Sequence, residues 1–152
     1  MKQFLTIGLI ALLLIGLPAL AQDDTDTVPG PAPVIETRAL AVDDVERTYV
    51  LAVPDNYDES QPLPLLVALH GAGGNGMEMA EHAGLGDVPT QAGAIVAYPD
   101  AIDESWNYLF GEEGVDDTGF IRALIDETVA EYAIDESHVY LTGYSNGGLM
   151  AV

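Results

Sequence analysis

Cysteine is absent from the 152 residues, and basic residues are scarce: the chain has four Lys and Arg residues and 25 Asp and Glu residues. The absence of cysteine excludes disulfides, thiolate nucleophiles, Cys-ligated metals and a lipid attached through an N-terminal Cys. The formal net charge of −21 at pH 7 repels phosphate backbones and anionic lipid surfaces. We therefore expect no nucleic-acid partner. A salt-rich habitat and an ordinary acidic extracellular protein both remain explanations for the acidic surplus.

Aromatic residues are few, at 7%, but 49% of the residues are hydrophobic, which suffices for one globular core or part of one. A long apolar run occurs only near the start, where Ile7 to Leu17 follows Lys2 and precedes the small-x-small triplet Ala19-Leu20-Ala21. This pattern predicts a signal peptide, residues 1–21, that is cleaved before Gln22. The run is shorter than the ~20 residues of a membrane-spanning helix, and an uncleaved anchor is the alternative. Either reading predicts export, to the extracellular space or the periplasm, and cleavage leaves no stable membrane insertion.

The rest of the chain predicts a short linker and then a domain of alternating strands and helices. Residues 22–33 are rich in Asp, Thr, Pro and Gly and predict a flexible linker. Residues 34–152 form the predicted domain, which begins with an antiparallel hairpin around Asp43-Asp44 because both flanking stretches alternate apolar and polar residues. Continuous apolar runs predict strands buried on both faces. The expected strands are 34–42, 45–53, 65–69, 94–98 and 139–141, and the expected helices are 76–83 and 115–132, the latter capped by Asp116 or Asp117.

This order of elements predicts an α/β fold with three layers, in which an edge hairpin precedes three parallel strands and helices cover both faces. The segment Gly143-Tyr144-Ser145-Asn146-Gly147 is a G-x-S-x-G sequence between a predicted strand and a predicted helix. In that context a sharp turn presents the central serine above the sheet, while Gly143 and Gly147 let neighbouring chain pass without Cβ clashes. Ser145 is therefore the candidate nucleophile, and a glycine-rich turn without chemistry is the alternative.

A second glycine-rich segment, His70 to Gly76, directly follows a predicted buried strand. Acyl transfer builds negative charge on a carbonyl oxygen, and backbone amides beside small residues can stabilise it. We assign these oxyanion donors to the amides of Ala72 and Asn146, with Gly71 as a supporting residue. A flexible glycine turn is the alternative. His70, at the strand end, is expected to brace the loop rather than act as general base, and the other histidines, His82 and His138, are weaker candidates.

The sequence lacks the residue patterns of phosphate-binding loops and of metal sites. The His70–Gly76 loop lacks the G-K-[ST] ending of a phosphate-binding loop. The acidic residues show neither H-E-x-x-H nor calcium-loop spacing. We therefore expect no metal and no cofactor.

Four segments of the chain are more particular than the G-x-S-x-G sequence alone: Leu69-His70-Gly71-Ala72-Gly73-Gly74-Asn75, Ser105-Trp106-Asn107-Tyr108, Val115-Asp116-Asp117-Thr118-Gly119-Phe120-Ile121, and Val139 to Ala151 around Ser145. Through these segments the chain resembles, from about Val34 to the last residue, the secreted polyhydroxybutyrate depolymerase and feruloyl esterase group of α/β-hydrolases. The resemblance implies a serine esterase that works through an acyl-enzyme on an ester substrate, either polymeric or derived from plant cell walls. Trp106 resembles an aromatic residue near the cleft of such relatives, and plain core packing is the alternative. Several relatives carry Cys at the positions of Ala72 and Ser105.

The resemblance also implies a catalytic Asp and His after the nucleophile, in the order Ser, acid, His. Only Asn146 to Val152 follow Ser145, so we expect both partners downstream and the given chain to be the N-terminal part of the catalytic domain. A phospholipase, thioesterase or peptidase on the same fold remains an alternative. So does an extracellular binding module that lacks catalysis.

Overall fold

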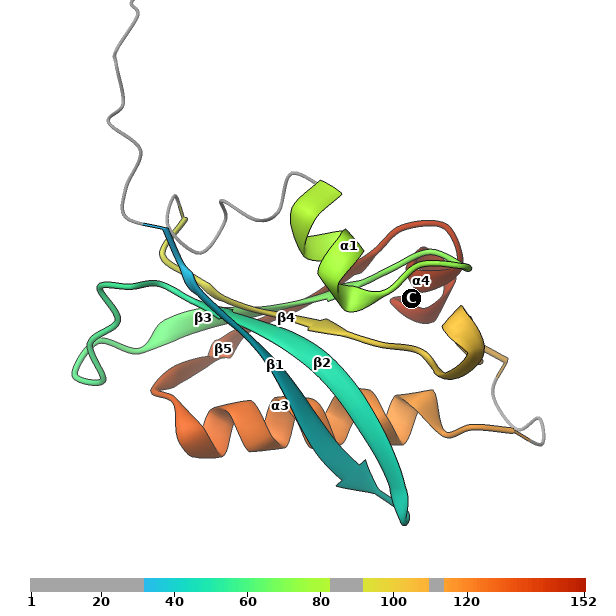
Figure 1. Cartoon of the computed structure of the whole chain (residues 1–152). Coiled ribbons are helices and arrows are strands. Elements are labelled where there is room, and N and C mark those ends of the chain that lie inside the picture. The colour runs from blue at the N-terminus through green and yellow to red at the C-terminus, as the bar shows by residue number, and fades with distance from the viewer. Residues whose placement is uncertain (1–31, 83–91, 110–113) are drawn as a thin grey trace, which may run out of the picture.

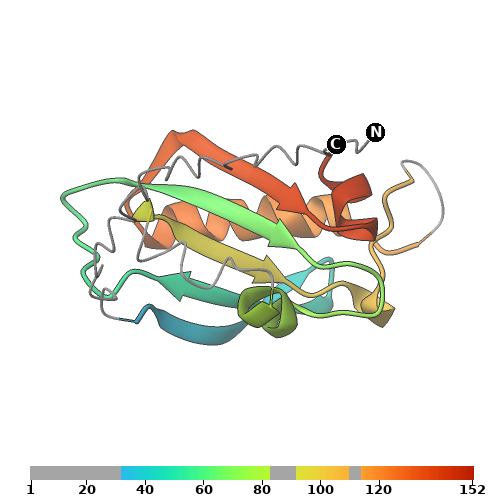
Figure 2. The same ribbon diagram turned by 90° about the horizontal axis from the view of Figure 1, so that it is seen from above.

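The computed structural model describes residues 32–82, 92–109 and 114–152, so the expected signal peptide and nearly all of the linker lie outside the described residues. Five strands form one sheet in the order β1-β2-β4-β3-β5, which Figure 2 shows from above. The strands are β1 (Val34–Val42), β2 (Val45–Val53), β3 (Leu63–Leu69), β4 (Ile95–Pro99) and β5 (Ile134–Gly143). The helices are α1 (Gly76–His82), the 3-10 turn η1 (Ile102–Glu104), α3 (Asp117–Glu131) and α4 (Asn146–Met150).

The hairpin at the sheet edge is confirmed with the predicted bounds. β1 pairs antiparallel with β2, from Val34 opposite Val53 to Val42 opposite Val45. Asp43 and Asp44 make the two-residue turn with φ of 49° and 63°. Positive φ at both positions is the turn geometry whose twist matches that of a hairpin, and Asp tolerates it better than most residues.

The predicted parallel part of the sheet is also confirmed. β3 pairs parallel with β4 on one side and with β5 on the other, while β4 pairs antiparallel with β2. All five residues of β4 are buried, as the continuous apolar run predicted. β5 begins at Ile134 rather than Val139, so His138 lies inside the strand and not in a turn before it. The polar residues 135–138 hid this extension, because most of them face solvent and interrupt the apolar pattern.

Helices cover both faces of the sheet, as expected, with α1 on one side and α3 on the other (Figure 1). Helix α3 packs its buried residues, among them Phe120 and Leu124, into the larger of two hydrophobic clusters. The smaller cluster lies around Val96, Tyr98 and Ala80 of α1. Of the two predicted capping residues, Asp116 is the N-cap, because its carboxylate accepts a hydrogen bond from the Gly119 amide at 2.8 Å.

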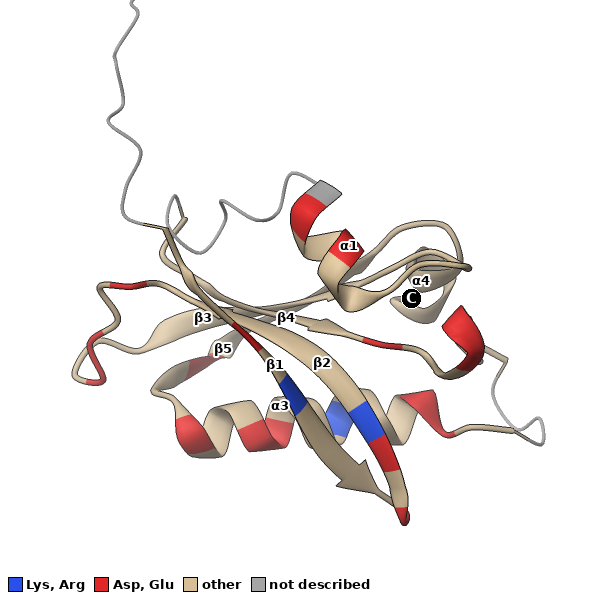
Figure 3. Cartoon of the chain, in the orientation of Figure 1, with Lys and Arg blue, Asp and Glu red and all other residues tan. Residues whose placement is uncertain are grey.

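Charged residues are arranged around this sheet and not within its centre. Figure 3 shows acidic positions on α1, on α3 and in the loops, whereas β3 and β4 carry no charged residue. Arg38 of β1 joins the hairpin to the end of α3, where it contacts Glu131 at 2.5 Å and donates to the Tyr132 hydroxyl at 2.7 Å.

Among the described residues, no helix has the length and apolarity needed to cross a membrane.

Candidate active site

Ser145 lies on a sharp turn between the end of β5 and the start of α4. Its φ of 51° and ψ of −115° fall in a region that a residue with a side chain rarely adopts. Such a conformation costs on the order of 1–3 kcal/mol and persists only where the surroundings impose it. Here the Tyr144 amide donates to the Leu69 carbonyl at 3.1 Å, and the Gly147 amide donates to the Tyr144 carbonyl at 2.9 Å. The turn therefore holds an exposed Ser145 at the carboxyl end of the sheet.

The two glycines of the motif are required by close backbone contacts. A Cβ on Gly143 would overlap the backbone of Gly147, and a Cβ on Gly147 would overlap the carbonyl oxygens of Leu69 and His70. Backbone, unlike the end of a flexible side chain, cannot move aside cheaply. The sequence G-x-S-x-G thus lets α4 start directly against the end of β3.

The glycine-rich loop after β3 lies beside this turn. A Cβ built on Gly71 would lie 3.5 Å from the Ser145 Cβ, so the loop and the candidate nucleophile are neighbours. The loop is fixed by hydrogen bonds from the Gly73 amide to the Glu104 carbonyl at 2.8 Å and from the Gly74 amide to the Gly71 carbonyl at 3.1 Å. Within the described residues, no hydrogen bond occupies the amides of Ala72 and Asn146. Both amides thus remain available to a ligand.

His70 is buried and has both ring nitrogens engaged. Its Nε2 accepts a hydrogen bond from the Ala101 amide at 3.0 Å, and its Nδ1 lies 2.7 Å from the Gly71 carbonyl oxygen. Because Nε2 is the acceptor, the neutral ring carries its proton on Nδ1 and donates it to that carbonyl. No ring nitrogen is left to receive a proton from Ser145. The geometry supports a bracing role for His70.

Trp106 is 2% exposed and belongs to the larger hydrophobic cluster. Its indole Nε1 donates to the His70 carbonyl at 2.9 Å, and its ring centroid lies 5.0 Å from that of His70. Its backbone amide donates to the Asn146 side-chain oxygen at 2.7 Å, and Asn146 Nδ2 donates back to the Trp106 carbonyl at 3.2 Å. Trp106 therefore packs in the core and at the same time contacts both halves of the candidate oxyanion site.

A buried ion pair supports this region, and the sequence patterns did not reveal it. Arg47 of β2 contacts Asp117 of α3 at 2.6 Å, and their side chains are 2% and 1% exposed. The second oxygen of Asp117 accepts from the Asn107 amide at 2.7 Å. A signal was present, because strand alternation places Arg47 on the same face as the core residues Tyr49 and Leu51. A charge at an inward position requires a charged or hydrogen-bonding partner.

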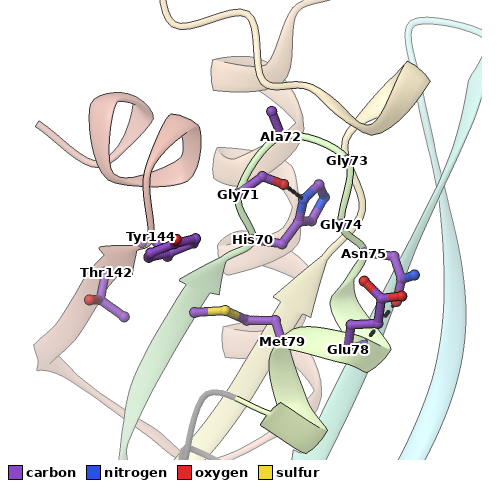
Figure 4. Close-up of a pocket in the computed structure, with 11 residues that line it drawn as sticks. His70, Gly71, Ala72, Gly73, Gly74, Asn75, Glu78, Met79, Thr142 and Tyr144 are labelled. Atoms are coloured by element: carbon purple, nitrogen blue, oxygen red, sulfur yellow. Dashed lines mark hydrogen bonds between the residues drawn. The ribbon is translucent and has the colours of Figure 1, made fainter.

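A cavity of about 830 Å³ borders the turn on the side of α1 (Figure 4). Tyr144, which is 71% exposed, and Gly71 flank it at one end, and Met79 of α1 reaches into it. Ser145 and Trp106 do not line it. The lining residues are His70, Gly71, Ala72, Gly73, Gly74, Asn75, Glu78, Met79, Thr142, Gly143 and Tyr144.

Known proteins resemble this chain in sequence and in fold. The chain is 33% identical to feruloyl esterase C of Emericella nidulans over 69% of its residues, and 26% identical to feruloyl esterase D of Neurospora crassa over 93%. Among solved structures it resembles a CE1 ferulic acid esterase of Anaeromyces mucronatus, with a TM-score of 0.60, 19% identity and 81% of this chain covered. The chain has the α/β-hydrolase fold and is similar to feruloyl esterases in sequence.

Two further findings qualify this kinship. No protein-family model matches the chain. This α/β-hydrolase chain spans 39% and 52% of the length of the two curated relatives, and 53% of the Anaeromyces structure. A thermostable esterase, 26% identical with a TM-score of 0.61, covers 76% of this chain, which in turn covers 36% of that esterase.

His138 is not placed beside Ser145. It lies in the middle of β5, five residues before Gly143, and a rise of ~3.3 Å per strand residue puts it roughly 16 Å from Gly143. The side chain of His82 lies outside the described part. Within residues 32–82, 92–109 and 114–152, no group of three or more His, Asp and Glu side chains could hold a metal ion.

Proposed function

We propose that the whole protein hydrolyses carboxylic esters through an acyl-enzyme on Ser145. The backbone conformation of Ser145 carries this proposal, because the strain of a positive φ at a non-glycine residue is retained where it positions a functional group. The neighbouring free amides of Ala72 and Asn146 and the named esterase relatives support it.

In the proposed reaction, Ser145 Oγ attacks the ester carbonyl carbon and loses its proton to a general base. The carbonyl oxygen becomes an oxyanion that accepts hydrogen bonds from the amides of Ala72 and Asn146. Collapse of this intermediate expels the alcohol, which takes up the proton, and leaves the acyl group on Ser145. Water then attacks the acyl-enzyme by the same route and releases the acid.

The general base is proposed to be a histidine outside the described residues, held by an acidic residue. The described geometry favours this, because His70 has both ring nitrogens engaged and His138 lies in the middle of β5, five residues before its carboxyl end. The catalytic order of this fold, in which acid and histidine follow the serine, points the same way.

Aromatic-acid esters of the feruloyl type are the proposed substrate class. The names of the curated relatives support it, and one solved relative from Anaeromyces mucronatus contains ferulic acid. The sequence resemblance leaves polyhydroxyalkanoates as the second class. Methyl ferulate and a soluble 3-hydroxybutyrate oligomer distinguish the two, and a higher kcat/KM for the oligomer would reverse the assignment.

The central test is covalent labelling of the protein expressed from its complete reading frame. A fluorophosphonate probe should label the protein, and Ser145→Ala should abolish both labelling and ester hydrolysis. Ser137→Ala is the matched control, because Ser137 also lies on β5 and hydrogen-bonds to a histidine and an aspartate. Labelling that survives Ser145→Ala, or disappears in Ser137→Ala, would contradict the proposal.

Export through residues 1–21 is part of the proposal. The apolar run and the Ala-x-Ala ending support cleavage between Ala21 and Gln22. N-terminal sequencing of the mature protein should begin at Gln22 or its cyclised form. Retention of Met1 in a membrane fraction would favour an anchored protein.

A further inference from the structure

The two candidate oxyanion donors come from different elements. Ala72 belongs to the loop after β3, and Asn146 begins α4 after β5. An oxyanion site works only when both amides lie about 2.7–3.1 Å from the same oxygen atom, so the distance between the two elements has to be fixed. The two elements are joined directly by the hydrogen bond from the Tyr144 amide to the Leu69 carbonyl. This bond lies before Ala72 in one element and before Asn146 in the other, so it does not hold the two donors themselves.

The segment after β4 supplies the remaining links, and they converge on Trp106. Its backbone forms two hydrogen bonds with the Asn146 side chain, of 2.7 Å and 3.2 Å, which fix the first residue of α4. Its indole Nε1 forms a third, of 2.9 Å, with the carbonyl of His70, two residues before Ala72. One residue therefore holds both elements, through different groups.

Trp106 is itself held from behind. The next residue, Asn107, donates its amide to Asp117, and Asp117 is paired with Arg47 in the core. This anchorage ties the segment to β2 and α3, which do not belong to the candidate site. Trp106 is therefore fixed independently of the two elements that it contacts, as a rigid support has to be.

We infer that Trp106 is a positioning residue that sets the spacing between the oxyanion amides of Ala72 and Asn146. The inference rests on the proposed esterase function of Ser145. Without the indole N–H, the His70 carbonyl of the loop loses its hydrogen bond to Trp106. Without the Asn146 side chain, the start of α4 loses its two hydrogen bonds to the Trp106 backbone. Either change lets one donor drift from the position where the oxyanion forms.

The test uses the full-length protein and replaces single hydrogen-bonding groups. Trp106→Phe keeps a buried ring and removes the Nε1 donor, and Asn146→Ala removes both side-chain bonds to Trp106. Tyr57→Phe is the matched control, because it also removes one side-chain bond to the backbone, from the Ala133 amide at 2.7 Å, but near the start of β5. Urea unfolding of each variant establishes that the protein remains folded at the assay temperature.

Kinetics on a 4-nitrophenyl ester and its thiono analogue separate positioning from general damage. Sulfur is a poor hydrogen-bond acceptor, so the thiono ester depends less on the two amides. We expect Trp106→Phe to lower kcat on the oxygen ester by about tenfold, with KM changed by less than about twofold, because a small misplacement of a donor affects the transition state alone. The loss on the thiono ester should be smaller. The double variant should lose less than the product of the single losses, since both act on one support.

Equal losses on the two esters, or a Trp106→Phe loss no larger than that of Tyr57→Phe, would overturn the inference. Wild-type protein that fails to hydrolyse any ester would overturn the proposed function instead. In that event hydrogen exchange still decides the structural claim. Trp106→Phe should then speed amide exchange in both 71–74 and 145–148, and exchange confined to one of these segments would refute it.

Discussion

One serine lies within β5 and another on the turn after it, and their surroundings differ. Within the strand, the Ser137 hydroxyl donates to Asp135 at 2.6 Å and lies 3.0 Å from the Nδ1 atom of His138. After the strand, Ser145 has no hydrogen bond to a histidine in the described structure, but it lies on a strained turn near the free amides of Ala72 and Asn146. By residue types alone, the first group looks more like a catalytic triad.

The geometry reverses that impression. A catalytic histidine accepts the serine proton on one nitrogen and is oriented through the other. In the first group both Ser137 and Asp135 contact the same Nδ1 of His138, so no relay across the ring exists. The group is a solvent-exposed cluster of neighbouring residues on β5. The comparison teaches that the backbone around a serine indicates chemistry better than the presence of His and Asp nearby.

The largest expected contrast concerns two aspartates that contact a basic side chain, Asp117 behind the candidate site and Asp135 on β5. Asp117→Asn should reduce the free energy of unfolding by about 3–5 kcal/mol, because it leaves the Arg47 charge buried without a counter-charge. Asp135→Asn removes a contact whose side chains are 40–53% exposed and should lower the urea midpoint at pH 7 only slightly. Equal shifts in urea unfolding for the two variants would remove the distinction between the buried Arg47–Asp117 pair and the exposed group on β5.

The next contrast is between two substitutions of Ala72 and tests whether its backbone amide acts as a donor beside Ser145. Ala72→Pro removes an amide and should lower kcat for ester hydrolysis by about 10²-fold. Ala72→Gly keeps the amide and should retain substantial activity, which makes it the matched control. Turnover measured on a 4-nitrophenyl ester checks both. A tolerated proline would take Ala72 out of the site.

The smallest expected effect is the pH dependence of the surface group. Hydrogen bonds from Ser137 and from His138 hold the pKa of Asp135 below its ordinary value. A lowered pKa stabilises the folded state above the pKa of the unfolded chain, about 3.9, and this contribution disappears as pH falls through the folded value. The small stability difference between wild type and Asp135→Asn should therefore narrow as the pH falls below about 4. Urea unfolding from pH 3 to 7 measures this, and a gap that widened towards acid would contradict the sign.

The sequence predicted local features well, because their causes are local. The hairpin around Asp43-Asp44 follows from alternation on both sides of a two-residue turn, and its observed bounds agree with the prediction. The turn at Ser145 was visible because its glycines flank a serine between strand and helix patterns. The early start of β5 at Ile134 was not visible, because a solvent-facing strand at the edge of the described sheet lacks an apolar run.

Contacts between distant segments were beyond sequence patterns. Arg47 and Asp117 are 70 residues apart, and Trp106 meets Asn146 across 40. The motif containing Asp117 suggested a helix start, and its neighbour Asp116 took that role. Which of two adjacent aspartates faces inward depends on where β2 lies, and only the folded sheet determines that.

Trp106 has an optical consequence, because it is the single tryptophan among these 152 residues. Its indole is 2% exposed and hydrogen-bonded to the His70 carbonyl, so its fluorescence arises beside the candidate oxyanion loop. A buried indole emits at shorter wavelength than one in water. In this chain the emission maximum therefore reports, without any added label, whether the loop and the turn at Ser145 are still held together.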